Sequence, residues 1–150
     1  MKKHTVKVRN VIFGGGAPFV LIAGPCVIED RRSTLRIAGD LVALAGRLGI
    51  PFVFKASYDK ANRTSIDAFR GPGLEEGLDI LAEVRERWNV PVLSDVHDVR
   101  EVDLAEKVLD VIQIPAFLCR QTSLLVRAAQ SGRAVNVKKG QFLAPWDVKS

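Results

Sequence analysis

The sequence contains few cysteines and no long apolar segment, and both absences narrow the class of protein. Its two cysteines, Cys26 and Cys119, are too few for the disulfide framework of a small secreted protein, so we expect free thiols. No segment approaches the roughly 20 apolar residues that a membrane-spanning helix needs. Residues 5–9 alternate polar and apolar side chains and do not form the apolar core of a signal peptide. These features predict a cytoplasmic protein with no membrane partner.

Clustered basic charge and aromatic residues are also scarce, although the chain is basic overall. The 22 Lys and Arg residues outnumber the 17 Asp and Glu residues, for a formal net charge of +5. The chain has no run of five or more Lys and Arg residues, and aromatic residues make up only 7% of it, which argues against a nucleic-acid-binding arm or a base-stacking surface. We therefore expect small anionic ligands and no nucleic-acid partner, because the basic residues of interest lie in separate turns.

What the sequence does contain is a regular alternation of short apolar runs with amphipathic stretches. The runs are rich in Val, Ile and Phe, as strands buried on both faces are. They lie at 19–23, 52–54, 90–93, 111–114 and 134–137. Between them apolar residues recur at helical spacing, as Leu41, Leu44 and Leu48 do before Gly49, a residue suited to end a helix. This order predicts an α/β fold with a parallel sheet.

The turn after the first run distinguishes between two parallel folds. It reads Gly24-Pro25-Cys26 and lacks the G-x-G-x-x-G pattern of a dinucleotide-binding fold. A (β/α)8 TIM barrel has eight strand–helix units in about 250 residues. We therefore predict a single, incomplete TIM-barrel domain over 1–150 with about the first five β/α units, as the N-terminal part of a longer protein. A short N-terminal β-hairpin or extension over 1–16 precedes it.

Polar residues gather directly after the predicted strands. In a TIM barrel the loops at the carboxyl ends of the strands form the active site, and a long polar loop follows the second strand here. Cations that converge at such a rim suit ligands that carry phosphate and carboxylate groups. The candidate residues at this rim are Lys55, Lys60, Arg63, Asp95, Gln113, Arg120 and Lys138.

Several segments together resemble the 3-deoxy-manno-octulosonate 8-phosphate synthases. They are 54–65 (FKASYDKANRTS), 70–75 (RGPGLE), 110–122 and 136–146, and the similarity extends over roughly 19–147. The resemblance implies a transferase of Kdo and lipopolysaccharide biosynthesis. In this reaction carbon 3 of phosphoenolpyruvate attacks the aldehyde of arabinose 5-phosphate, water adds at carbon 2, and phosphate leaves with cleavage of its C–O bond.

The resemblance also implies roles for individual residues at the phosphoenolpyruvate end of the site. Residues that look like Lys60, Gln113 and Lys138 hold phosphoenolpyruvate in such enzymes. Lys60 and Asp95 are the expected catalytic residues, because their counterparts orient the sugar near the reacting aldehyde. Cationic side chains that are already positioned in the site would offset the repulsion between two anionic substrates.

The sugar phosphate is expected to lie against the long loop. Residues that look like Asn62, Arg63 and Thr64 hold it in this family, and the last two reach in from a neighbouring subunit, which implies a homo-oligomer, a tetramer by resemblance. Thr64 stands where the family usually has Ser, which keeps the hydroxyl but narrows the fit. The full expected substrate-binding set is Lys55, Ser57, Lys60, Asn62, Arg63, Thr64, Asp95, Gln113, Ala116, Arg120 and Lys138.

Cys26 separates two subclasses of these synthases. The metal-dependent subclass resembles this chain in having Cys at this turn, whereas the metal-independent subclass has Asn. Thiolates favour soft or borderline divalent ions. The resemblance therefore implies a zinc, iron or manganese ion bound by Cys26, with further ligands beyond residue 150.

Two other functions remain open at this stage. The related 3-deoxy-arabino-heptulosonate 7-phosphate synthases, which take erythrose 4-phosphate, typically carry Lys-Pro-Arg-Thr where this chain has Lys60-Ala61-Asn62-Arg63. An inactive, anion-binding barrel fragment is the second alternative.

Four residues near the motifs have other interpretations. We expect Cys119 to be a small buried residue. His97 is either catalytic or hydrogen-bonded by its neighbours in a structural role. Arg120 contacts phosphate or forms a structural ion pair. Tyr58 stands where Phe is usual in the family, a change that we expect to be neutral.

Overall fold

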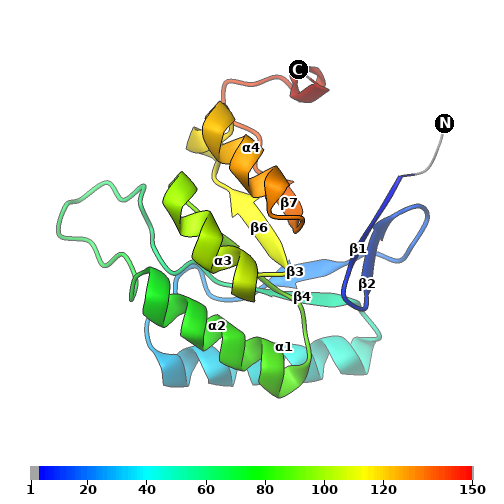
Figure 1. Ribbon diagram of the computed structural model, residues 1–150. Coiled ribbons are helices and arrows are strands. Elements are labelled where there is room, and N and C mark those ends of the chain that lie inside the picture. The colour runs from blue at the N-terminus through cyan, green and yellow to red at the C-terminus, as the bar shows by residue number, and fades with distance from the viewer. Residues whose placement is uncertain (1–3, 150) are drawn as a thin grey trace.

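The computed structural model of the protein describes residues 4–149 and contains an antiparallel hairpin and a five-stranded parallel sheet (Figure 1). The sheet has the order β3-β4-β5-β6-β7, so strands adjacent in the chain are adjacent in space. A doubly wound sheet would reverse its strand order part-way, whereas a barrel does not. The predicted α/β fold with five parallel units of a TIM barrel is therefore confirmed. The strands are β1 (Thr5–Val8), β2 (Val11–Gly14), β3 (Leu21–Ala23), β4 (Phe52–Lys55), β5 (Val92–Asp95), β6 (Val111–Ile114) and β7 (Ala134–Val137).

Four α-helices lie along one side of the sheet, between successive strands (Figure 1). The first begins at a local signal, since the Asp30 side chain accepts a hydrogen bond from the Ser33 amide at 2.8 Å. It ends at Gly49, whose φ of 63° is left-handed, as the sequence predicts. The helices are α1 (Arg31–Leu48), α2 (Leu74–Trp88), α3 (Val102–Val108) and α4 (Thr122–Gln130), with 3-10 turns η1 (Val99–Glu101), η2 (Ala116–Leu118) and η3 (Pro145–Lys149).

Two predicted strands begin later than the apolar runs. The run at 90–93 becomes β5 at Val92–Asp95, because Pro91 has no amide hydrogen to donate to a ladder. The Val92 amide, which opens the strand, donates instead to the Asp110 side chain at 3.0 Å. The run at 19–23 begins as β3 only at Leu21, since Phe19 is 68% exposed.

Alternate residues of the strands face opposite sides of the sheet. Residues such as Phe54 and Ile112 pack against the helices in the main core. Their neighbours Val53, Leu93 and Val111 form a second apolar layer on the inner side of the sheet. Each lies near the amino end of its strand, so this layer forms the floor of the partial barrel.

The hairpin covers that floor. Val8 and Val11 are 4% and 2% exposed and pack against Val53, Leu93 and Val111. Arg9, in the turn between β1 and β2, donates to the Asn89 side chain at 2.5 Å and lies 3.9 Å from Asp110. The predicted N-terminal hairpin is thus present, although residues 1–3 of the predicted 1–16 extension lie outside the described residues.

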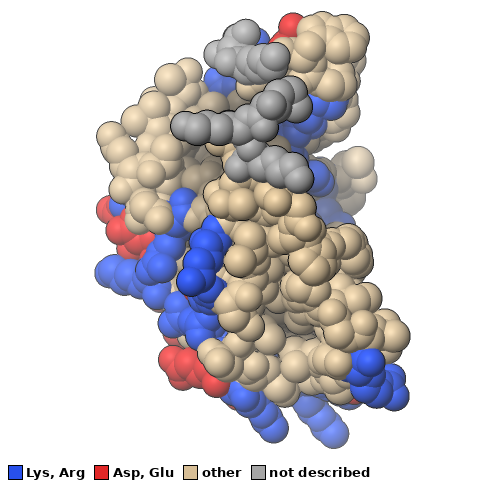
Figure 2. Space-filling view, turned by 90° about the vertical axis from the view of Figure 1, so that its right-hand side faces the viewer, with Lys and Arg blue, Asp and Glu red and all other residues tan. Residues whose placement is uncertain are grey.

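The surface on the hairpin side carries its charge at the edges. Figure 2 shows Lys and Arg side chains gathered mainly along one edge of this face, while most of its centre is uncharged. Within residues 4–149 no helix is long and apolar enough to cross a membrane.

Candidate active site

Strand alternation places a polar layer directly above the apolar floor. Lys55, Asp95 and Gln113 each lie two residues beyond Val53, Leu93 and Val111, so they share the inner face with them. Asp95 pairs with Gln113 in the register of β5 and β6, and Gln113 pairs with Asn136 of β7. The sheet therefore aligns four polar side chains at the carboxyl ends of neighbouring strands, where barrel enzymes hold their catalytic groups.

Three of these residues, Lys55, Asp95 and Gln113, line a cavity of about 300 Å³ at the carboxyl ends of the strands. Two loops close its sides, the one after β4 and the one after β6 that includes η2. The structure brings seven of the predicted substrate-binding residues to this cavity, including both predicted catalytic residues. The lining residues are Lys55, Lys60, Ala61, Asn62, Asp95, His97, Gln113, Pro115, Ala116, Phe117, Leu118, Lys138 and Gln141.

Ser57 connects three charged groups from beneath the cavity. Its buried hydroxyl donates to Asp95 Oδ1 and accepts from the ammonium groups of Lys55 at 3.2 Å and Lys60 at 2.9 Å. A hydroxyl has one hydrogen to donate and two lone pairs, so all of its bonding capacity is used. Ser57 was predicted to bind substrate, and in the structure its hydroxyl contacts Lys55, Lys60 and Asp95.

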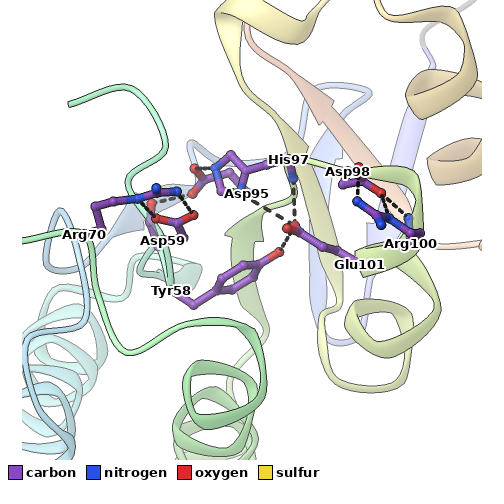
Figure 3. Close-up of polar contacts among 9 residues, drawn as sticks. Tyr58, Asp59, Arg70, Asp95, His97, Asp98, Arg100 and Glu101 are labelled. Atoms are coloured by element: carbon purple, nitrogen blue, oxygen red, sulfur yellow. Dashed lines mark hydrogen bonds and ion pairs between the residues drawn. The ribbon is translucent and has the colours of Figure 1, made fainter. Parts of the chain in front are cut away.

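The carboxylate of Asp95 is kept ionised although the residue is only 6% exposed. Burial alone would raise the pKa of Asp95, but hydrogen bonds from His97 and Ser57 and the nearby Lys55 ammonium lower it to about 2. The Nε2 atom of His97 lies 3.1 Å from Asp95 Oδ2 (Figure 3). Asp95 therefore presents a fixed negative charge and accepts hydrogen bonds at neutral pH.

The other charges of the cavity are positive. Burial, followed by repulsion from Lys60, lowers the pKa of Lys55. Lys138 joins the rim because its amide continues the ladder by donating to the Ile114 carbonyl at 3.0 Å. Three lysines face one aspartate, and the excess positive charge favours an anionic ligand, which would relieve the repulsion among them.

Gln113 is held by a neighbour that sequence reasoning did not include. Asn136 Nδ2 donates to Gln113 Oε1 at 2.9 Å. This contact occupies the carbonyl oxygen of Gln113 and leaves its amide hydrogens as donors for a ligand. Asn136 follows Ala134 by two residues, so strand alternation is the signal that indicates it.

The long loop after β4 is fastened at its base. Arg70 forms a two-point contact with Asp59, at 2.8 and 2.5 Å, and its carbonyl accepts from the Lys60 amide at 2.7 Å (Figure 3). The base of the loop therefore positions Lys60, while the rest projects from the body of the fold (Figure 1).

Besides Ser57, three of the predicted substrate-binding residues do not line the cavity. Arg63 and Thr64 are exposed on the projecting loop, where Arg63 Nε donates to the Phe69 carbonyl at 3.0 Å. Arg120 is exposed and lines a separate depression with Phe117 and Cys119. The expectation that Cys119 is buried is wrong, since it is partly exposed at the edge of that depression.

A second depression, of about 580 Å³, lies between α1 and α2 on the outer side of the fold. It is lined by arginines and Trp88, but two of the arginines already have acidic partners. Arg31 pairs with Glu83, and Arg36 lies 3.9 Å from Asp40. All of its lining residues belong to α1 and α2 and none to a strand, so the cavity at the strand ends is the candidate active site.

Cys26 lies at the same rim, after β3. The turn that contains it pairs with the Ser57 segment, since the Ile28 amide donates to the Ser57 carbonyl at 2.9 Å. Cys26 is exposed and not in a disulfide, so its sulfur is free to bind a metal ion. Residues 4–149 contain no group of three or more His, Cys, Asp or Glu side chains arranged to hold one.

Comparison with known proteins agrees with this geometry. The sequence profile described as the DAHP synthetase I family matches residues 2–150. The chain belongs to the DAHP synthetase I family. Within it, the chain is 61% identical over 145 residues to a 2-dehydro-3-deoxyphosphooctonate aldolase of Geobacter sp. (strain M21), an alignment that covers 97% of this chain and 53% of that protein.

Two other relatives have the same name. The 2-dehydro-3-deoxyphosphooctonate aldolase of Fusobacterium nucleatum is 57% identical over 147 residues, covering 98% of this chain and 53% of that protein. That of Syntrophotalea carbinolica is 60% identical over 144 residues, covering 96% and 52%. The chain thus spans about half the length of these relatives, and the predicted recognition of the octulosonate 8-phosphate synthase group is confirmed.

Proposed function

We propose that the whole protein condenses phosphoenolpyruvate with arabinose 5-phosphate and water to give 3-deoxy-manno-octulosonate 8-phosphate and phosphate. The observation that carries this proposal is the convergence of Lys55, Lys60 and Lys138 beside the ionised Asp95 in one cavity. The names of the relatives support the same product.

The cavity residues have two proposed roles: some bind phosphoenolpyruvate and others orient the sugar. Lys60, Lys138 and the amide hydrogens of Gln113 would bind the phosphate and carboxylate of phosphoenolpyruvate. Asp95 accepts hydrogen bonds only, so it would orient hydroxyl groups of the sugar. The new bond joins carbon 3 of phosphoenolpyruvate to the aldehyde carbon, and water supplies the oxygen at carbon 2 as phosphate departs.

The acceptor phosphate is proposed to lie between subunits. Arg63 and Thr64 lie on a projecting loop outside this chain's own cavity, and Ile66 on the same loop is 95% exposed. These positions support a homotetramer in which the loop reaches a neighbouring site, where Arg63, Thr64 and Asn62 bind the sugar phosphate. Arg120 remains a candidate phosphate contact there.

A divalent metal ion is part of the proposal. The exposed thiol of Cys26 fits zinc, iron or manganese, and the other ligands would come from outside residues 1–150. When bound, such an ion would polarise an oxygen of the substrate or of water. The same free cysteines support a cytoplasmic, reducing location.

The test uses the whole protein. Phosphate release is followed with phosphoenolpyruvate and either arabinose 5-phosphate or erythrose 4-phosphate, before and after chelation. Release with arabinose 5-phosphate alone is expected, together with loss on chelation and recovery with added metal. Turnover of erythrose 4-phosphate instead would favour the heptulosonate synthase, and no release with either sugar would favour an inactive anion-binding protein. Activity that is indifferent to the chelator would remove the metal from the proposal and leave the synthase.

A further inference from the structure

A second row of polar side chains lies behind the cavity. Its centre is Glu101, at the end of η1, whose Oε2 atom accepts from the Tyr58 hydroxyl at 2.7 Å and from the His97 amide at 2.8 Å. The same oxygen lies 3.6 Å from His97 Nδ1, while the other ring nitrogen faces Asp95 (Figure 3). The imidazole of His97 therefore stands between two carboxylates.

Packing fixes this arrangement from the side. Tyr58 is 1% exposed, and its ring meets the His97 ring edge to face, with centroids 6.0 Å apart and planes at 88°. Gly77 of α2 makes room for Tyr58, because a Cβ atom at Gly77 would lie 2.2 Å from Tyr58 Cβ. The tyrosine is thus held in one position, and so is the hydroxyl that bonds Glu101.

We propose that Glu101 and Tyr58 are positioning residues, which hold the His97 ring as a cation against Asp95 so that this carboxylate keeps one orientation in the cavity. The inference rests on the proposed function in one respect only: in that function, Asp95 orients the substrate. Neither residue lines the cavity itself.

The physical reason lies in the two nitrogens of the ring. A neutral imidazole that donates from Nε2 to Asp95 presents a lone pair at Nδ1, and that lone pair would face the Glu101 carboxylate. Only the imidazolium has a hydrogen for each side. His97 Nδ1 is buried and has no hydrogen bond of normal length. The polar group that faces it is the Glu101 carboxylate, 3.6 Å away.

The charges around His97 favour the same state. Asp95 faces it from β5, Glu101 from η1 and the Tyr58 ring from the segment after β4, while Lys55 acts on the far side of Asp95. Burial alone would lower the pKa of His97, but the contacts with Asp95 and Glu101 raise it to about 9. The ring therefore stays protonated through neutral pH.

The Tyr58 hydroxyl has a specific place in this arrangement. The synthases that the sequence resembles usually have Phe there, and the sequence alone gives no reason to expect an effect. Here the hydroxyl that Phe lacks is the donor that holds Glu101. Tyr58→Phe keeps the ring and its packing on Gly77, so it removes that hydrogen bond alone.

The first test is a histidine titration that needs no substrate. In the whole protein labelled with ¹³C-histidine, the NMR signal of His97 is assigned by its loss in His97→Asn and followed with pH. A titration near pH 9 is expected in the wild type, with a decrease of about one pH unit or more in Glu101→Gln and a smaller decrease in Tyr58→Phe. A wild-type titration near 6.5, or no decrease in Glu101→Gln, would overturn the proposal.

Asp98→Asn is the matched control. Asp98 is three residues from Glu101, pairs with Arg100 and caps η1 through the Arg100 amide, a role that Asn also fills (Figure 3). Like Glu101→Gln, the Asp98→Asn substitution removes one negative charge from this turn, but the His97 titration should not change. An equal decrease in this variant would mean that overall charge, and not contact, sets the state of His97.

The second test compares rate profiles. The alkaline limb of kcat/KM for phosphate release should move to lower pH in Glu101→Gln by the same interval as the NMR titration. A shift of one pH unit, from about 9 to about 8, lowers the protonated fraction of His97 at pH 8.5 from about three quarters to about one quarter, so kcat/KM at that pH should fall about threefold. An unmoved limb beside a shifted NMR titration would overturn the positioning role. If the enzyme releases no phosphate at all, the proposed function fails, while the titration still decides whether Glu101 and Tyr58 hold His97.

Discussion

The floor of the barrel offers a sharp test of the fold, because two adjacent residues of β2 differ in burial. Val11 is 2% exposed against Val53, Leu93 and Val111, whereas Ile12 is 45% exposed. Val11→Ala removes two methyl groups from the apolar layer, at about 0.8 kcal/mol each, and leaves a cavity that adds to the cost. We expect a loss of about 2–3 kcal/mol in the free energy of unfolding.

Ile12→Ala is the control, and it removes one carbon more. Both substitutions lose a β-branched residue from the same strand, so the difference between them isolates burial. We expect Ile12→Ala to cost less than about 1 kcal/mol. The assay is denaturant unfolding of the whole protein at one fixed concentration, since oligomerisation would shift the midpoint. If Ile12→Ala destabilises as much as Val11→Ala, the hairpin does not close the floor as the structure indicates.

Three further predictions concern the rim of the cavity. Lys138→Met should raise the KM or Kd for phosphoenolpyruvate by on the order of tenfold or more. Lys139→Met should not, because Lys139 donates to the carbonyls of Gly140 and Leu143 outside the cavity. Equal effects of the two substitutions would refute the assignment of Lys138 to the substrate. Cys26→Ser should reduce bound metal, measured by elemental analysis, and Cys119→Ser should leave it unchanged; metal retained in Cys26→Ser would exclude the thiol as a ligand. Since burial and neighbouring cations lower the pKa of Lys55, a bound phosphate should raise it again. Binding of phosphoenolpyruvate at alkaline pH should then take up protons, and calorimetry in buffers of different ionisation enthalpy should show a buffer-dependent heat. A heat that is the same in all buffers would contradict this.

Residue patterns were enough to predict the elements and their order. The strands are short apolar runs and the helices have 3.6-residue periodicity, and both are properties of neighbouring residues. The boundaries were less accurate where a contact distant in sequence intervenes, as at β5, whose first amide bonds to Asp110 eighteen residues later. The parallel, sequential order of the strands followed from the alternation of strand and helix.

The candidate site was predicted in part for the same reason. Lys55, Asp95 and Gln113 end their strands on one face, so alternation along each strand is sufficient to bring them together. Lys60 and Lys138 were candidates because they follow strands. The substrate contacts expected of them and of Asn62 came instead from resemblance to known enzymes, because residues in loops follow no periodicity. Arg63 and Thr64, which the resemblance assigns to the site of a neighbouring subunit, lie outside this chain's own cavity, and their role there stays a prediction.

The sequence by itself determined the β/α alternation, the strand-end positions of the polar residues and the excess of positive charge. Only the tertiary structure decided how these groups interact. It placed Ser57 where its hydroxyl joins Asp95 to Lys55 and Lys60, and it brought Tyr58 and Glu101 behind His97. The contacts of Ser57 with Asp95 and of Tyr58 with Glu101 join the loop after β4 to β5 and η1, across 38 and 43 positions. Side chains so far apart in sequence come into contact only because neighbouring parallel strands end at the same edge of the sheet. The charge state of Asp95 and of His97 depends on these contacts.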